Sequence, residues 1–239
     1  MAADTLVIVT ACNEAERIGA TLAALARAFP GAPLFLADDG STDATPEIAR
    51  AAGAQVVRSE RMIGKGAAAT LAAREALRDA RLRPGGEDED GGTEDGESMI
   101  VLCDGDLGAS AGELLALADT IRRAAADVAV AAFARRVGGG IGLARAFARW
   151  AIRRRCGLRT AAPISGQRAL RARVLRDVLP FAPGFGMEVG MTIDAVRGGY
   201  RVVEVELDLA HRSTGRTLAG FAHRGRQLVD FARVYVDRR

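Results

Sequence analysis

The chain has 239 residues, of which 49% are hydrophobic and 26% are charged, a composition typical of a globular protein with one buried core. Its 33 basic and 30 acidic residues give a formal net charge of +3. Aromatic residues make up only 5% of the chain, which disfavours a single-strand nucleic-acid binder that stacks bases on aromatic rings, and we expect no nucleic-acid partner.

The charge is unevenly distributed along the chain. Residues 87–97 include seven carboxylates and no basic residue, so the rest of the chain carries a formal charge of roughly +10. Such an excess of positive charge favours anionic ligands such as phosphates. Residues 84–98 have no large apolar side chain to bury, and we predict a disordered acidic loop there.

Short apolar runs alternate with longer helical patterns, which is typical of a parallel sheet built from strand–helix–strand units. The predicted strands are Leu6–Thr10, Pro33–Ala37, Ala54–Arg58, Met99–Cys103, Asp127–Phe133 and Val202–Leu207. The sequence therefore predicts an α/β fold with a mostly parallel central sheet flanked by helices.

Amphipathic periodicity predicts the helices between these strands. The predicted helices are Glu14–Phe29, Ala44–Ala52, Lys65–Ala80, Ile141–Cys156 and, at the end of the chain, about Thr217–Asp237. The glycine-rich segment Arg135–Gly140 is predicted to be a loop. Because no internal repeat or linker is visible, we expect one domain that spans residues 1–239.

The cysteines and the apolar runs bear on the compartment. Cys12, Cys103 and Cys156 are odd in number and widely spaced, so neither a disulfide framework nor a zinc site is indicated. No apolar run approaches the roughly 18–20 residues that span a bilayer, and the first residues do not resemble a secretion signal. We expect a cytoplasmic protein whose membrane contact, if any, is peripheral, and the sequence is compatible with a homodimer.

Ligands of open α/β sheets bind beyond the carboxyl ends of the strands, so the loops that follow the strands are the first places to look for function. Four of these loops have unusual chemistry: Thr10–Glu14, Asp38–Asp43, Gly64–Gly66 and Asp104–Asp106. We expect all four to converge on one edge of the sheet.

Asp104 and Asp106 come directly after the apolar strand Met99–Cys103. Two carboxylates on a tight turn can hold a hard divalent cation that keeps several waters and bridges substrate phosphates. The pattern is short, and Asp88–Asp90 in the acidic loop matches it by chance. Helix capping is the alternative reading of the pair.

The adjacent carboxylates Asp38 and Asp39 fit either a turn with a helix cap or a ligand contact. On a strand end they point in opposite directions, so one can bond to the backbone while the other reaches a ribose or base. Lys65, the only lysine, lies between two glycines, where it can approach a pyrophosphate closely. A solvated lysine at a helix start is the alternative.

In that order, Thr10–Glu16, Asp38–Thr45, Gly64–Gly66 and Asp104–Asp106 resemble the family 2 glycosyltransferases of the GT-A fold. The resemblance covers nearly the whole chain and implies a nucleotide-sugar donor with Mg²⁺ or Mn²⁺ on its diphosphate, held by Asp104 and Asp106. The residues it implies for donor binding are Thr10, Ala11, Cys12, Glu14, Asp39, Lys65, Asp104 and Gly105.

The second half is similar to a narrower group, the glucosyl-3-phosphoglycerate synthases, at Pro163–Gln167, Gly184–Asp194 and His211–Arg212. This resemblance implies that His211 completes the metal site and that Glu188 contacts the sugar. It also implies that a loop before Ser165–Gly166 binds a phosphorylated acceptor. The chain is shorter than these synthases and differs from them in that loop.

These resemblances and the residue chemistry complete the expected site. The catalytic candidates are Glu188 and Asp106, and whether Glu188 is a base or only accepts a hydrogen bond from a sugar hydroxyl stays open, as does the retaining or inverting outcome. The acceptor-binding candidates are Arg135, Arg136, Ser165, Gly166 and Arg212, since guanidinium groups suit phosphate and carboxylate.

Three functions fit this site. The first is a metal-dependent transferase that moves a hexose from a UDP- or GDP-sugar, with UDP-glucose favoured, to a small anionic acceptor such as 3-phosphoglycerate. The second has a polyprenyl phosphate as acceptor, because Ile141–Arg155 intersperses Phe147, Trp150 and Ile152 with arginines and could lie on an anionic membrane; a core helix with a basic outer face is its alternative. The third is a non-catalytic nucleotide-sugar binding module.

Overall fold

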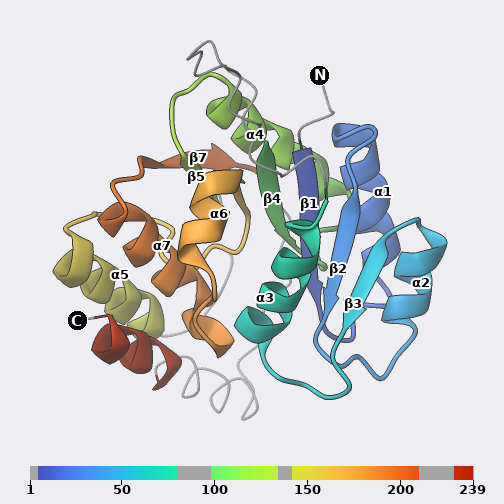
Figure 1. Cartoon of the computed structure of the whole chain (residues 1–239), viewed down its shortest axis with the longest axis horizontal. Coiled ribbons are helices and arrows are strands. Elements are labelled where there is room, and N and C mark those ends of the chain that lie inside the picture. The colour runs from blue at the N-terminus through green and yellow to red at the C-terminus, as the bar shows by residue number, and fades with distance from the viewer. Residues whose placement is uncertain (1–4, 80–97, 134–141, 210–228, 239) are drawn as a thin grey trace.

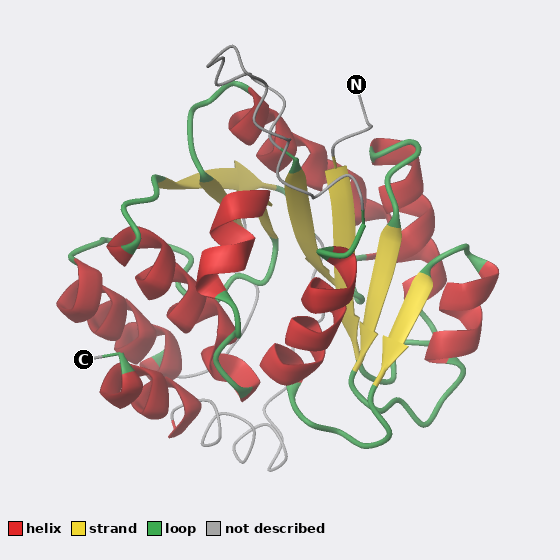
Figure 2. Ribbon diagram, in the orientation of Figure 1, coloured by secondary structure: helices red, strands yellow, loops and turns green. Residues whose placement is uncertain are grey.

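The computed structural model describes residues 5–79, 98–133, 142–209 and 229–238. Its centre is a seven-stranded sheet with the order β3-β2-β1-β4-β6-β5-β7 (Figures 1 and 2). The strands are β1 (Thr5–Ala11), β2 (Leu34–Asp38), β3 (Gln55–Arg58), β4 (Met99–Asp104), β5 (Val128–Phe133), β6 (Arg168–Arg171) and β7 (Val202–Leu207). Strand β6 runs antiparallel to both β4 and β5, whereas the other neighbours pair in parallel.

Helices lie on both faces of this sheet (Figure 2). They are α1 (Ile18–Ala28), α2 (Thr45–Ala51), α3 (Lys65–Ala76), α4 (Leu115–Arg122), α5 (Leu143–Cys156), α6 (Ala172–Val178) and α7 (Met187–Arg197), with 3₁₀ turns η2 (Gly108–Leu114) and η3 (Gly184–Gly186). Residues 229–237 are also helical. The predicted α/β class with a mostly parallel sheet is confirmed.

Alternate residues of β1 supply the two faces of the core, because successive side chains of a strand point to opposite sides. Val7 and Val9 pack in a buried cluster with residues of α1 and α4. Leu6 and Ile8 pack in a second cluster with residues of α3, α6 and α7. Cover on both faces explains why the inner strands β1, β2 and β4 are almost continuously apolar.

Five buried alanines let α3 approach the sheet closely, namely Ala68, Ala69, Ala72, Ala73 and Ala76. The helix begins at Lys65, directly after Gly64, whose φ of 93° few other residues adopt. The start of the helix is thereby fixed at the carboxyl edge of the sheet, where the strand arrows end in Figure 2.

For the basic helix, α5, the structure agrees with the reading as a core helix with a basic outer face rather than with the membrane-surface reading. Ile152, which the membrane hypothesis placed outward, is 0% exposed and packs in a third buried cluster with Val189 of α7 and Phe231. Leu143 and Trp150 do remain 62% and 49% exposed. In the part of the chain that the structure describes, no helix is long and apolar enough to cross a membrane.

The six predicted strands are confirmed, with ends shifted by at most one residue. Strand β6 and helices α4 and α6 were not predicted. The acidic loop at 84–98 lies outside the described residues except for Ser98, and Arg135–Gly140 lies outside them altogether.

Candidate active site

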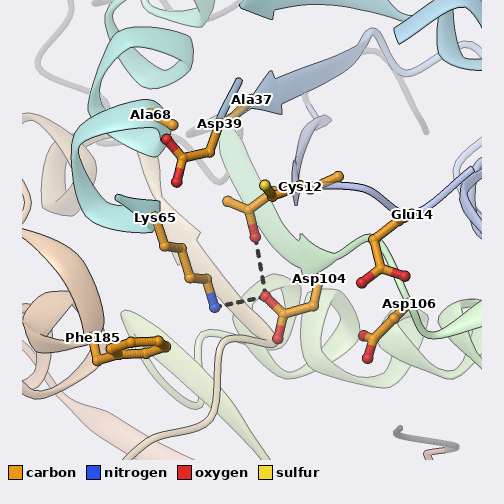
Figure 3. A pocket seen from close by; sticks show the side chains of 12 residues that line it. Cys12, Glu14, Ala37, Asp39, Lys65, Ala68, Asp104, Asp106 and Phe185 are labelled. Carbon is orange, nitrogen blue, oxygen red and sulfur yellow. Dashed lines mark hydrogen bonds and ion pairs between the residues drawn. The ribbon is translucent and has the colours of Figure 1, made fainter. Parts of the chain in front are cut away.

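A cleft of about 320 Å³ lies where β1, β2 and β4 end (Figure 3). It is lined by Thr10, Ala11, Cys12, Glu14, Ala37, Asp39, Lys65, Ala68, Asp104, Gly105, Asp106 and Phe185. These include every residue predicted to bind the nucleotide sugar, together with Asp106. The four loops therefore converge on one edge, as the strand-end argument predicted.

Lys65 is held between two carboxylates. Its Nζ lies 2.6 Å from Asp104 Oδ1 and 2.6 Å from Glu188 Oε1. Burial alone would lower the pKa of Lys65, but the two negative charges and their hydrogen bonds outweigh it and raise that pKa. Burial likewise acts against the charged form of Asp104, yet the Lys65 ammonium lowers its pKa. Both groups are therefore charged at neutral pH.

The Asp104 carboxylate is fixed by two further donors. Thr10 Oγ1 donates to Oδ1 at 3.0 Å, and Gln167 Nε2 donates to Oδ2 at 2.8 Å. A carboxylate oxygen accepts about two hydrogen bonds, so Oδ1 is saturated by Thr10 and Lys65 whereas Oδ2 keeps room for one further partner. The carboxylate is thus oriented with one oxygen available.

Asp106 follows on a tight turn that packs against the first loop. The Gly105 N–H donates to the Thr10 carbonyl at 2.9 Å, and a Cβ on Gly105 would lie only 3.0 Å from Ala11 Cβ. Asp106 is only 9% exposed although it follows the end of a strand. The close packing of the turn on the Thr10–Glu14 loop accounts for this burial.

The donor set fits a hard divalent cation. Asp104 Oδ2 and the Asp106 carboxylate supply oxygen ligands, and Glu14 lies on the same side of the cleft as Asp106 (Figure 3). Within the described residues no group of three potential ligands is close enough to hold a metal, and the predicted third ligand, His211, lies outside them. Two carboxylates with substrate phosphates and waters suffice for Mg²⁺.

The two adjacent aspartates at the end of β2 both accept hydrogen bonds from the backbone. Asp38 is fully buried, accepts from the Ser41 N–H at 3.1 Å and pairs with Arg58 at 3.2 Å. Asp39 accepts from the backbone N–H groups of Ile63 and Gly64 at 2.6 and 3.0 Å. We expected only one of them to bond to backbone. Asp39 lines the cleft and also anchors the loop that leads to Lys65.

Glu188 and the Ser165–Gly166 loop also pack against the Lys65–Asp104 ion pair. Glu188, the second residue of α7, is 5% exposed, and its carboxylate reaches Lys65 from that helix. A Cβ on Gly166 would come within 2.6 Å of Lys65 Nζ and 2.8 Å of Asp104 Oδ2. Only glycine fits there without displacing the ion pair.

The other acceptor candidates, Arg135, Arg136 and Arg212, lie outside the described residues. Ser165 is buried, and its hydroxyl donates to Gln167 Oε1 at 3.2 Å. The acceptor assignments of these residues therefore stay predictions.

Sequence reasoning missed Phe185, which lines the cleft, and Gln167, which bonds to Asp104. Both lie inside motifs that were noticed, so the position of each motif was the available signal. Cys12 was expected only as a lining residue. Burial raises the pKa of its thiol and the charge of Asp39 raises it further, which makes Cys12 a poor nucleophile.

Comparison with known proteins decides the family. The model of glycosyl transferase family 2 matches residues 6–179. The chain belongs to this family. It is therefore a glycosyltransferase of the GT-A fold, and the alternative of a non-catalytic binding module is set aside. Among curated proteins, none matches the sequence.

This family 2 glycosyltransferase is similar in structure to glucosyl-3-phosphoglycerate synthase from Mycobacterium tuberculosis. The synthase with phosphoglyceric acid has a TM-score of 0.70 and 24% identity, over 98% of this chain and 79% of that one. The complex of the synthase with Mn²⁺, UDP-glucose and phosphoglyceric acid has a TM-score of 0.70 and 24% identity, over 97% of this chain and 79% of that one. A further structure of the synthase has a TM-score of 0.68 and 25% identity, over 98% of this chain and 80% of that one.

Proposed function

We propose that this glycosyltransferase moves glucose from UDP-glucose to a small phosphorylated acceptor such as 3-phosphoglycerate. The observation that carries the proposal is the cleft, in which Lys65, Asp104 and Asp106 face the lining of the Thr10–Glu14 loop. The similar synthase has been crystallised with UDP-glucose, Mn²⁺ and phosphoglyceric acid, which supports the same substrate class here.

The two ends of the cleft differ in a way that suits a nucleotide sugar. Asp39 and Ala68 lie at one end, and Glu14 and Asp106 lie at the other (Figure 3). We assign the nucleoside to the end with Asp39 and the diphosphate to the end with the paired aspartates. Phe185 supplies an apolar wall beside Lys65, where a sugar ring can pack.

Mn²⁺ or Mg²⁺ would be held by Asp104 and Asp106, with His211 as the proposed third ligand. When bound, the cation neutralises negative charge on the diphosphate leaving group. The chain itself contributes the Lys65 ammonium, which lies 2.6 Å from Asp104 and adds fixed positive charge in the same cleft. Glu188 holds that ammonium in place and is our candidate acceptor for a sugar hydroxyl.

We assign the binding of the acceptor charge to Arg135, Arg136 and Arg212, and we assign Ser165 and Gly166 to the acceptor site as well. We further propose that the enzyme works in the cytoplasm. A polyprenyl phosphate is the second candidate acceptor, because Leu143 and Trp150 are exposed on α5 among arginines. Sedimentation with anionic vesicles tests that candidate.

The deciding experiment incubates UDP- and GDP-sugars with 3-phosphoglycerate, glycerol 3-phosphate and a short polyprenyl phosphate. Each pair is tested with Mn²⁺, Mg²⁺ or EDTA, and products are read by mass spectrometry. We expect glucosyl-3-phosphoglycerate only from UDP-glucose and 3-phosphoglycerate, only with metal, and not from Asp106→Asn. Transfer that persists in EDTA would contradict the metal role, and a different preferred acceptor would overturn the substrate assignment.

A further inference from the structure

Arg168 is buried in the middle of the sheet, where an apolar residue would be expected. It is 1% exposed on β6, and its neighbours across the sheet are Leu102 of β4 and Val130 of β5. Removing a guanidinium from water is costly unless its donors are satisfied. A charge kept at such a position therefore needs specific partners.

The partners of Arg168 lie on two segments that are distant in sequence. Nε donates to the Ser165 carbonyl at 2.9 Å, Nη2 to the Glu188 carbonyl at 3.0 Å, and Nη1 to Thr192 Oγ1 at 3.0 Å. Burial lowers the pKa of Arg168 to about 10, although the charge of Glu188 opposes this shift. The side chain is thus protonated at neutral pH, and its fork joins the loop before β6 to the first turns of α7.

Both of these segments carry groups of the active site. The loop continues into Gly166, which packs on the Lys65–Asp104 pair, and Gln167, which donates to Asp104. The start of α7 carries Glu188, whose carboxylate binds Lys65. The contacts close a ring that runs from Arg168 through Gln167, Asp104, Lys65 and Glu188 back to Arg168.

We propose that Arg168 is a positioning residue for glycosyl transfer, which fixes the distance between the Ser165–Gln167 loop and Glu188 and so sets the geometry of Lys65 and Asp104. The roles of these groups in donor binding rest on the proposed function above. Arg168 itself touches no substrate, because it lies behind the cleft.

The first experiment measures kcat, the KM for UDP-glucose and the melting temperature of Arg168→Met and Arg168→Lys. We expect kcat of Arg168→Met to fall about 10- to 100-fold, a range typical of groups that orient ligands from behind. Arg168→Lys keeps the positive charge but loses the forked guanidinium, so its kcat should lie between that of wild type and that of Arg168→Met. A kcat of Arg168→Met within twofold of wild type would overturn the proposal.

Arg171→Lys is the matched control. Arg171 lies on the same strand and donates to the Ile121 carbonyl at 3.2 Å, but it pairs with Met99 at the opposite edge of the sheet. We expect its kcat within about twofold of wild type, since its contacts with Ile121 and Asp127 lie far from the cleft. An equal loss from both arginines would show a merely structural role.

A double-mutant cycle with Glu188→Gln separates positioning from general stability. If Arg168 acts through Glu188 and Lys65, Arg168→Lys should cost several-fold less kcat in the Glu188→Gln background than in wild type. If the fold-loss of kcat in the double variant equals the product of the losses in the two single variants, the proposal is overturned. If the Arg168 variants fail to fold, Thr192→Val replaces them in the cycle, since it removes one acceptor of Arg168 and a hydroxyl that donates to the Glu188 carbonyl at 2.8 Å.

Hydrogen exchange measures the same effect without substrate. Exchange in the positioning variants should rise in peptides covering residues 163–167 and 187–192 and stay unchanged around β1 and β2. If wild type transfers no glucose from UDP-glucose, the proposed function fails while exchange still decides the role of Arg168. Unchanged or evenly raised exchange would overturn that role.

Discussion

Replacing Gly166 by alanine tests the central ion pair with the smallest possible change. The new Cβ would lie 2.6 Å from Lys65 Nζ and 2.8 and 2.9 Å from the Asp104 oxygens. Cβ atoms essentially never approach that closely. Either the ion pair or the loop must therefore move by about half an ångström or more, which is the scale on which active-site geometry fails.

The cost should appear mainly in catalysis. Lys65 is flexible and can retreat, so we expect the free energy of unfolding to fall by about 1 kcal/mol, the lower end for overpacking. Displacing Lys65 and Asp104 should lower kcat about 10- to 100-fold, because misplacement of about 1 Å can cost roughly 100-fold. The donor KM should rise at the same time, since both residues line the cleft.

The assay measures initial rates with UDP-glucose and 3-phosphoglycerate at saturating Mn²⁺, together with urea unfolding. Gly112→Ala is the control, because a Cβ there meets nothing within 4 Å and the position lies in η2. A Gly166→Ala enzyme with the kcat of Gly112→Ala would refute the inference that Gly166 limits the space around the ion pair.

Three further predictions follow from the same site. The ionised Asp104 stabilises the fold above its unfolded pKa of about 3.9, and this stability is lost as the pH falls through its lowered folded pKa. The protonated Lys65 stabilises the fold below its unfolded pKa of about 10.4, and this stability is lost as the pH rises through its raised folded pKa. The stability difference between wild type and Lys65→Met, followed by urea unfolding, should therefore be flat from about pH 5 to 9.5 and shrink above about pH 10.4; a constant difference up to pH 11.5 would contradict the raised pKa. His211→Ala should weaken the apparent Mn²⁺ affinity about 10- to 100-fold and recover at high Mn²⁺, whereas wild-type metal dependence would make His211 structural. Shortening residues 87–97 to a four-residue Gly-Ser turn should leave turnover within about twofold, because the segment joins α3 to the amino end of β4; a tenfold loss at unchanged melting temperature would place the segment near the cleft.

The alternation of apolar strands with amphipathic helices was sufficient to predict the parallel part of the sheet. Strand β1 is apolar on both faces, so a sequence pattern alone identifies it as buried. The loops after β1, β2 and β4 could then be placed together, because parallel strands bring their carboxyl ends to one edge. Local pattern thus predicted the lining of the cleft from Thr10 to Asp106.

The antiparallel strand β6 could not be predicted in this way. Residues Arg168–Arg171 are only four long and begin and end with arginine, a pattern that does not indicate a central strand. The strand exists because its backbone pairs with β4 and β5, because Ala169 and Leu170 pack into the two buried clusters on either face, and because Arg168 finds acceptors on α7. Those acceptors become neighbours only when the sheet has formed.

The sequence alone therefore predicted most of the residues that line the cleft, though not Phe185, since strand ends and their loops are local features. Tertiary structure decided how those residues are paired. Lys65 binds Glu188, which lies 123 positions further along the sequence, and Gln167 donates to Asp104 from 63 positions away. Ile152 is buried because α7 packs against it. The physical reason is that such pairs depend on the relative placement of whole elements, which no periodicity within one segment records.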